Sequence, residues 1–378
     1  MGRYASHLVR HRDPDTAVDV AADHLEAELA GQAPSLVVIT ASDAFRDEAD
    51  ELRRAVLRRF PGAQVAGAVI AGGVIGRGEE VEEAPAVSLL AAALPAGAVR
   101  VAALDDADEL PDHARLVVAF ADPFTLGAEE LSESADRCGV DLVGGFTGGY
   151  GPGSARLIAT DEVRTHGAVV LAVDLPGAAA VVSQGARPIG PDLVVTGAEG
   201  SVVLELAGKP AVEQLHGVLG SLDADDLALA RNGLMAGIVI DENRPDYGVG
   251  DFLVRGLVGV EAATGGLAVQ ALPRVGQTFR FHVRDAAGAD GDLRRALGER
   301  GGDAGAVLLF ACNGRGRRMF GEDHHDARVV DELLGVPVAG AFCQGELGPV
   351  AGANHVHAFT ATLAVLPPVC SAAPGAQT

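Results

Sequence analysis

The feature that most constrains this chain is a strand-like apolar run that ends in a glycine-rich turn, and it occurs three times. The copies lie at residues 65–75 (VAGAVIAGGVI), 143–151 (VGGFTGGYG) and 338–348 (VAGAFCQGELG). Glycine at the end of a strand indicates either backbone with positive φ or a close approach to another group. That group is a packed neighbour or a ligand, and the pattern alone leaves both open.

The three copies share a spacing of glycines. They align on Gly67, Gly145 and Gly340. Each copy has further glycines three to five positions later, namely Gly72, Gly148, Gly149 and Gly345. Three equivalent turns indicate duplicated α/β units, in which binding sites favour strand ends. None of the turns has the pattern of a phosphate loop, and the only lysine, Lys209, lies away from all of them, so a P-loop is excluded.

Helix-period and strand-like patterns alternate along the rest of the chain, with no long linker. Asp13 and Pro14 open a helical pattern that stops at Gly31. Further helices are predicted over residues 43–60, 128–138, 211–219, 292–300 and 326–334. Strands are predicted over residues 35–40, 64–70, 115–120, 235–241, 252–260, 266–272, 277–283, 306–311 and 356–366, with short β segments between 141 and 206.

The predicted strands outnumber the helices, which argues against a purely parallel, doubly wound sheet. We therefore expect an α/β fold of two related halves, each with a mixed, largely antiparallel sheet flanked by helices. The expected divisions are an N-terminal helical lead-in at 1–32, a first domain at 33–190, a second at 191–368 and a frayed tail at 369–378.

Charge and composition exclude several classes of function. The 52 acidic residues outnumber the 29 basic ones and give a net charge of −23, so phosphate backbones would be repelled and nucleic-acid binding is not expected. The four cysteines form no CxxC pair and no disulfide framework. The N-terminus has no apolar signal core, and the longest uncharged stretch, residues 84–99, is too short to span a membrane. A cytoplasmic protein without membrane contact is expected.

The C-terminal third holds the densest set of polar residues at strand ends. Cys312, Asn313 and Arg315 follow the apolar run 306–311. Cys343, Gly345 and Glu346 follow the next such run, and His355 and His357 come shortly after. The Arg315 guanidinium directly after a buried strand suits bidentate binding of a ligand carboxylate, and an ion pair with Glu346 is the alternative.

Two other uses of these residues are open. With a histidine and a carboxylate nearby, Cys312 or Cys343 would serve a hydrolase or transferase as nucleophile, although cysteine at a strand end is commonly a small buried hydrophobic residue. His355 and His357 share one face of a strand, but two histidines do not complete a zinc site. His324 and His325 begin an acidic helix and are expected to be solvated.

Taken in order, several segments resemble the FIST domain family, intracellular sensory proteins with an N-terminal and a C-terminal FIST half. In the first half these are residues 65–76, 119–124 (AFADPF) and 143–146 (VGGF). In the second half they are residues 250–255 (GDFLVR), 277–282 (QTFRFH), 312–315 (CNGR), 340–346 (GAFCQGE) and 357–360 (HAFT). Arg315 and Glu346 match the family's Cys-x-x-Arg and Gly-Glu positions, whereas Ala358 stands where the family commonly has Asn.

The resemblance implies sensing of a small ligand without catalysis, with an amino acid or another small carboxylate as the ligand and a separate protein as the signalling partner. The predicted ligand site comprises Gly72, Gly145, Cys312, Asn313, Arg315, Cys343, Gly345, Glu346 and His357. No catalytic residue, metal ligand or cofactor is assigned. Because some members of the family bind haem and sense nitric oxide, a haem sensor is an alternative, as is the cysteine-dependent enzyme.

Overall fold

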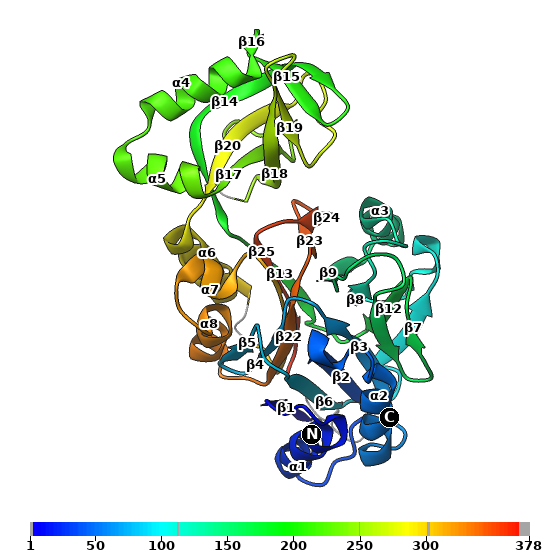
Figure 1. Cartoon of the computed structure of the whole chain (residues 1–378). Coiled ribbons are helices and arrows are strands. Elements are labelled where there is room, and N and C mark those ends of the chain that lie inside the picture. Colours follow the sequence, from blue (N-terminus) through cyan, green and yellow to red (C-terminus); the bar gives the residue numbers. More distant parts are fainter. Residues whose placement is uncertain (1–2, 112, 249, 301–302, 370–378) are drawn as a thin grey trace, which may run out of the picture.

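The computed structural model describes residues 3–111, 113–248, 250–300 and 303–369. These residues form a body of three six-stranded sheets and one further sheet that is closed into a barrel, which Figure 1 shows above the body. The predicted α/β class, with mixed and largely antiparallel sheets flanked by helices, is confirmed. Within the described residues, no helix combines the length and apolar character that crossing a membrane requires.

The first sheet of the body begins at the N-terminus. Its strand order is β1-β6-β2-β3-β10-β11. The strands and helices of this first unit are β1 (Arg3–Val9), α1 (Pro14–Leu29), β2 (Leu36–Ser42), the 3-10 turn Asp43–Phe45, α2 (Ala49–Arg59), β3 (Gln64–Ile70), β4 (Val74–Gly76), β5 (Glu79–Val81) and β6 (Val87–Ala93). Helix α1 begins as the sequence predicts, because the Asp13 carboxylate accepts the Thr16 N–H at 2.9 Å and Pro14 occupies the first turn.

The second sheet repeats the pattern in the order β7-β12-β8-β9-β23-β24. The second unit comprises β7 (Val99–Leu104), the 3-10 turn Ala107–Glu109, β8 (Leu116–Ala121), α3 (Ala128–Cys138), β9 (Asp141–Phe146), β10 (Arg156–Ala159), β11 (Val163–Arg164) and β12 (Ala168–Val173). Strands β8 and β9 are parallel, as are β2 and β3 in the first sheet.

The third sheet has the order β13-β25-β21-β22-β4-β5, with β21 and β22 as its parallel pair. The third unit comprises β13 (Ala179–Gln184), α6 (Ala286–Arg300), β21 (Ala306–Cys312), α7 (Gly316–Phe320), α8 (His325–Leu334), β22 (Val338–Cys343), β23 (Glu346–Val350), β24 (Ala353–His357) and β25 (Thr360–Leu366). The repeated unit is therefore one sheet, and it occurs three times in the body. The sequence indicated two related halves, each of which is larger than this unit.

The hairpin of each unit pairs with a strand in the sheet of another unit. The hairpin β4–β5 follows β3 in the chain but pairs with β22 of the third sheet. In the same way β10–β11 follows β9 and pairs with β3, and β23–β24 follows β22 and pairs with β9. This cyclic exchange ties the three units into one body. Segments far apart in the sequence therefore lie side by side at the edges of the sheets.

The three sheets enclose one central core and carry helices on their outer faces. The central core takes Val38, Phe120 and Phe310 from the three sheets, and the rings of Phe120 and Phe310 meet edge to face. Helices α1 and α2 cover the first sheet, α3 covers the second, and α6 and α8 cover the third. The edge strand β1 belongs to the first sheet, so the lead-in predicted at 1–32 is part of the body.

The barrel is inserted between β13 and α6. Its elements are β14 (Ala186–Glu199), β15 (Val202–Leu206), β16 (Lys209–Pro210), α4 (Ala211–Ser221), α5 (Ala224–Gly233), β17 (Leu234–Val239), β18 (Phe252–Glu261), β19 (Gly266–Val269) and β20 (Thr278–Arg284). Strand β14 pairs with both β20 and β15, which closes the sheet around its own apolar core. The boundary expected at residue 190 lies inside β14, and the tail expected at 369–378 lies, except for residue 369, outside the described residues.

A close backbone approach explains the repeated glycines. A Cβ atom on Gly67 would lie 1.7 Å from the Ile39 carbonyl oxygen, and one on Gly340 would lie 1.8 Å from that of Leu309. The equivalent position in the second unit is Gly144, where a Cβ would lie 2.0 Å from the carbonyl oxygen of its neighbour Ala119. The alignment on Gly145 is therefore wrong by one residue.

With Gly144 as the reference, the spacing is uniform. A further glycine stands five residues later in every unit, at Gly72, Gly149 and Gly345. The repeated spacing arises because each parallel pair brings its two backbones into contact at the same point.

We predict that Gly144→Ala lowers the free energy of unfolding by about 1–3 kcal/mol, because the new methyl group overlaps a backbone oxygen that cannot move alone. Urea denaturation followed by circular dichroism measures the change. Gly217→Ala is the matched control: Gly217 lies within α4 in open space, and alanine there should add about 0.5–1 kcal/mol. Equal effects of the two substitutions would contradict this role of Gly144.

Candidate ligand-binding site

The three glycine turns meet at one end of the body. The Ala71 N–H donates to the Thr147 carbonyl at 3.1 Å, and the Gln344 N–H donates to the Phe146 carbonyl at 2.9 Å. A Cβ atom on Gly148 would lie 3.3 Å from the Cβ of Ala71 and 3.5 Å from that of Gln344. Ala71, Gly148 and Gln344 hold the same position in the three units, so the turns converge around the common axis of the body.

Packing between the turns accounts for two of the predicted ligand-binding glycines. A Cβ on Gly72 would lie 2.5 Å from the Phe342 carbonyl oxygen, and one on Gly145 would lie 2.5 Å from the Cys343 sulfur. Gly345 has a φ of +109°, and its carbonyl oxygen accepts the Phe146 N–H at 3.0 Å. The close approaches that the sequence signals are thus contacts of one turn with another.

Arg315 is fully buried and is already paired. Its Nε and Nη2 donate to the two carboxylate oxygens of Asp326, at 2.7 and 2.8 Å. Burial disfavours the charge on Asp326, but the adjacent guanidinium outweighs this effect and lowers the pKa of the carboxyl to about 2. The ion-pair partner is therefore Asp326 and not Glu346, and the donor fork expected for a ligand carboxylate is occupied. The remaining nitrogen, Nη1, has no hydrogen-bond partner in the part of the chain that the structure describes.

Glu346 and Cys312 form a second buried polar contact beside Arg315. One Glu346 oxygen accepts the Thr360 N–H at 3.3 Å, and the other has no hydrogen-bond partner within the described ranges. Burial raises the pKa of the Glu346 carboxyl to about 8. Burial and the nearby Glu346 carboxyl raise the pKa of the Cys312 thiol to about 12, and burial raises that of Cys343 as well. Both thiols are therefore protonated at neutral pH.

The remaining predicted residues lie around the same strand ends. The Asn313 side chain is exposed, while its N–H donates to the Cys343 carbonyl at 2.9 Å. His357 is buried, with its Nε2 at 2.9 Å from the Gly348 carbonyl oxygen, and burial lowers its pKa to about 3. The nine predicted residues thus surround the ends of β21 and β22, and most of them are part of the protein interior.

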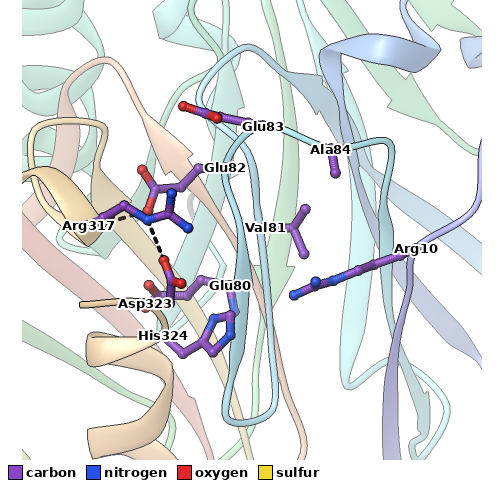
Figure 2. Close-up of a pocket in the computed structure, with 9 residues that line it drawn as sticks. All are labelled: Arg10, Glu80, Val81, Glu82, Glu83, Ala84, Arg317, Asp323 and His324. Atoms are coloured by element: carbon purple, nitrogen blue, oxygen red, sulfur yellow. Dashed lines mark hydrogen bonds and ion pairs between the residues drawn. The ribbon is translucent and has the colours of Figure 1, made fainter. Parts of the chain in front are cut away.

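A surface pocket lies next to this buried group and is shown in Figure 2. Its volume is about 190 Å³. It lies between the exchanged hairpin β4–β5 and the loops around α7, and Arg10 reaches in from the end of β1. The lining residues are Arg10, Glu80, Val81, Glu82, Glu83, Ala84, Arg317, Asp323 and His324. Charges of both signs face this pocket.

The exchanged hairpin positions the acidic residues of the pocket. The Glu82 carboxylate accepts the Arg317 N–H at 2.9 Å, and the Arg317 side chain donates to Asp323 at 2.5 Å. A second pocket of about 120 Å³, beside the turn at Ala71 and Gly73, shares residues 82–84 with the first. The pocket therefore extends toward the place where the glycine turns converge.

His324 combines backbone strain with a ring donor that has no hydrogen-bond partner among the described residues. Its φ of +66° is uncommon for a residue other than glycine. Its Nδ1 accepts the Glu80 N–H at 3.0 Å, so in the neutral ring the proton is on Nε2. His324 is half-buried, and His325 is buried between Asp326 and Asp290, 3.1 Å from each. The expectation that both histidines are solvated is therefore wrong.

Glu80 connects the pocket to the buried ion pair. Its Oε1 accepts the Ala327 N–H at 2.9 Å in the first turn of α8, the helix that also carries Asp326. Burial and the charge of Asp326 raise the pKa of Glu80 to about 8. Sequence reasoning did not find this residue. Glu80 and Ala327 are 247 positions apart, and only the hairpin exchange brings them together.

Comparison with known proteins identifies the family to which this threefold body and its charged pocket belong. The model of the FIST N domain matches residues 35–209, and that of the FIST C domain matches residues 211–349. The chain therefore belongs to the FIST family, whose domains are in general small-ligand sensory domains of signalling proteins.

Similar proteins occur in mycobacteria. An uncharacterized protein of Mycobacterium bovis is 42% identical over 372 residues, which cover 93% of this chain and 96% of the relative. An uncharacterized protein of Mycobacterium tuberculosis is 42% identical over 374 residues with the same coverage. Among solved structures, a cyanuric acid hydrolase from A. caulinodans aligns with 97% of this chain and 99% of its own at 13% identity and a TM-score of 0.28, a likeness that establishes neither fold nor activity.

We predict that Asp326→Asn destabilises the protein by about 3–5 kcal/mol, because it leaves the Arg315 charge buried without a counter-ion. Asp331→Asn is the control on the same helix. It breaks an exposed pair with Arg77 and should cost no more than about 1 kcal/mol. Urea denaturation of both variants measures the difference, and a loss of similar size in both would show that the buried pair is not a principal contact.

Proposed function

We propose that the chain is a cytosolic sensor that binds an amino acid, or a similar small zwitterion, in the pocket of Figure 2. The observation that carries this proposal is the arrangement of opposite charges around a pocket of about 190 Å³. Arg10 and the free Nε2–H of His324 suit a carboxylate. Glu82, Glu83 and Asp323 suit an ammonium group. This keeps the ligand class that the sequence predicts but moves the binding residues from Arg315 to the neighbouring pocket.

The contacts already made within the pocket leave room for such a ligand. The pair between Arg10 and Glu79 is exposed, and exposed pairs contribute about 1 kcal/mol at most, so a carboxylate competes readily for Arg10. Glu83 is exposed and has no hydrogen bond or ion pair within the described residues. It is therefore available to an ammonium group without the loss of an internal contact.

Glu80 connects the proposed ligand pocket to the buried ion pair of Arg315 and Asp326. A ligand charge in the pocket alters the electrostatic environment of Glu80, which in turn faces Asp326 and its partner Arg315. The affected helix, α8, covers the outer face of the third sheet. We propose that a separate signalling protein reads the resulting change, because FIST domains are in general sensory domains of signalling proteins.

A thermal-shift screen tests the ligand class. Amino acids should raise the melting temperature, because a ligand that binds only the folded state stabilises it. The corresponding 2-keto acids, which lack the ammonium group, and the corresponding amines, which lack the carboxylate, should have at most a small effect. Arg10→Gln and Glu83→Gln should each weaken binding of the best amino acid about tenfold or more, as expected for loss of a charge-assisted contact.

Arg58→Gln is the matched control for these variants, because Arg58 is an exposed arginine in α2, paired with Asp15, outside the pocket. It should leave the affinity unchanged. Equal stabilisation by amino acids, keto acids and amines would contradict the zwitterion, and the absence of any shift across the screen would remove the main support for an amino-acid sensor.

The cysteine-dependent enzyme is not favoured by the environment of the thiols. Cysteine reacts as the thiolate, and the raised pKa values of Cys312 and Cys343 leave little thiolate at neutral pH.

We predict that iodoacetamide at pH 7.5 modifies the half-buried Cys138 before Cys312 or Cys343 in the native protein. Peptide mass mapping measures the order. Rapid labelling of Cys312, with denatured protein as the reference for full reactivity, would restore the enzyme alternative.

The environments of His355 and His357 do not favour the haem alternative. An axial histidine binds iron through a free ring nitrogen, and the Nε2 of His357 is held by the Gly348 carbonyl. His355 has a buried Nε2 without a hydrogen-bond partner among the residues that the structure describes, but it would have to bind the iron alone. The residues present do not fit haem held by both histidines, so we propose a sensor without a bound cofactor.

A further inference from the structure

One edge of the third sheet has backbone groups without hydrogen-bond partners among the described residues. Strand β13 is the outermost strand of this sheet and pairs only with β25. In an antiparallel pair, residues alternate between those whose N–H and C=O groups bond the neighbouring strand and those whose groups point away from it. The Gly185 N–H donates to the Phe359 carbonyl at 2.9 Å, which fixes the phase of this alternation. The backbone groups of Ala180, Val182 and Gln184 therefore point away from β25.

A single side chain covers one end of this edge. The Gln184 N–H donates to the Asp292 carboxylate of α6 at 2.8 Å, in agreement with the direction derived from the pairing. Within the described ranges, no hydrogen bond reaches the N–H and C=O groups of Ala180 and Val182 on the side opposite β25. Ala180 is buried and Val182 is half-buried. Unpaired backbone groups in such surroundings are uncommon in folded proteins, and a further strand supplies the missing bonds.

The second sheet shows how such an edge is otherwise covered. Its outermost strand, β7, has the same place in the strand order as β13. The Gln64 side chain of the first unit donates to the Val99 carbonyl at 3.1 Å and accepts the Val101 N–H at 2.9 Å. This amide takes the place of a neighbouring strand. In the described part of the chain no side chain does the same for Ala180 and Val182, so the edge of β13 is open.

The open edge lies along a groove of about 320 Å³. Ala180, Val182 and Gln184 line this groove, together with residues of α6 and the turn at residues 349–352 between β23 and β24. An extended chain rises about 3.3 Å per residue, so the stretch from Ala180 to Gln184 accommodates a segment of about four or five residues. The groove thus combines room for a peptide with the unpaired donors and acceptors that β-strand addition requires.

The charged residues that line the groove are mostly acidic. They are Asp141, Asp292, Glu299 and Arg295, which amounts to three negative charges and one positive charge. Arg295 donates to Asp292 at 2.6 Å and is paired with Glu299 at 3.0 Å. The pair with Glu299 is exposed, and exposed pairs of this kind contribute little to stability, so another basic side chain competes readily for Glu299. Lysine or arginine on an incoming segment is therefore favoured.

We propose that the edge of β13 is a docking site for an extended, basic segment of a partner protein, which adds to the third sheet as a further strand. The N–H and C=O groups of Ala180 and Val182 hold its backbone, and Glu299 binds a lysine or arginine side chain. The groove shares no lining residue with the pocket of Figure 2, and the proposal does not depend on the function proposed for that pocket. Because Gly185 alone separates β13 from β14, the added strand lies next to the connection between body and barrel.

Fluorescence anisotropy with the full chain tests this site. The probe is a labelled, acetylated peptide of six alternating lysine and valine residues, and it should bind saturably. The same peptide with every residue N-methylated keeps the charges but lacks the backbone donors, so it should bind at least tenfold more weakly. A peptide with glutamate in place of lysine should also bind at least tenfold more weakly, because the groove is acidic.

Two variants locate the binding on the protein. Val182→Pro removes an N–H that points into the groove but no hydrogen bond to β25, and it should weaken binding tenfold or more. Glu299→Lys places a positive charge at the groove and should weaken binding by a similar factor. Glu213→Lys is the matched control, because Glu213 likewise forms an exposed pair with a basic residue four positions away, in the barrel. It should leave the affinity unchanged.

Glu299→Lys keeps the test valid if Val182→Pro fails to fold, since it changes only an exposed side chain. Equal affinity for the N-methylated peptide, or unchanged affinity in folded Val182→Pro, would overturn strand addition. Equal affinity for the glutamate peptide would overturn the basic partner, and the absence of saturable binding would overturn the docking site. Sedimentation of the chain alone tests a second copy as the occupant: a dimer that Val182→Pro dissociates would overturn the separate partner.

Discussion

The contact between the two backbones of each parallel pair is the constraint on which the rest of the structure depends. At Gly67, Gly144 and Gly340 the neighbouring carbonyl oxygen occupies the space of a side chain, so only glycine is accommodated. The strands continue from these points into turns that meet around one axis, and each turn leads into a hairpin that pairs with another sheet. The threefold exchange, the central core and the position of the pocket all follow from this geometry.

A buried ion pair is the second feature on which the candidate site depends. Arg315 and Asp326 are paired in the interior, and such a pair is costly to form and more costly to break. Glu80 stands between this pair and the solvent-facing pocket, with its pKa raised by burial and by Asp326. The pocket is thereby connected to charged groups inside the third unit, which is the unit into which the barrel is inserted.

Local structure was largely predictable from the sequence, because local signals determine it. The cap at Asp13 set the start of α1, and the predicted limits of β3 and α3 agree with the structure. The glycine spacing also identified repeated turns, although the register of the second copy was wrong by one residue. The family was predicted from motifs in order, and the FIST matches confirm it.

The site itself was less predictable, because its contacts are long-range. The sequence located polar residues at the ends of β21 and β22 but assigned Arg315 to a ligand or to Glu346, whereas the Asp326 carboxylate on α8 occupies it. The acidic wall of the pocket comes from β4–β5 and the loop after it, and no local pattern shows that this hairpin pairs with β22. The closed barrel could not be predicted either, because its closure depends on pairing between β14 and β15. Apolar runs in the sequence do not specify which strands pair.

A crystal structure of the chain with the amino acid that stabilises it most tests the proposed site directly. Electron density for the ligand is expected between Arg10 and the acidic residues Glu82 and Glu83, with its carboxylate toward Arg10 and His324. Density for that amino acid only at another location, or bound with its ammonium group toward Arg10, would contradict it.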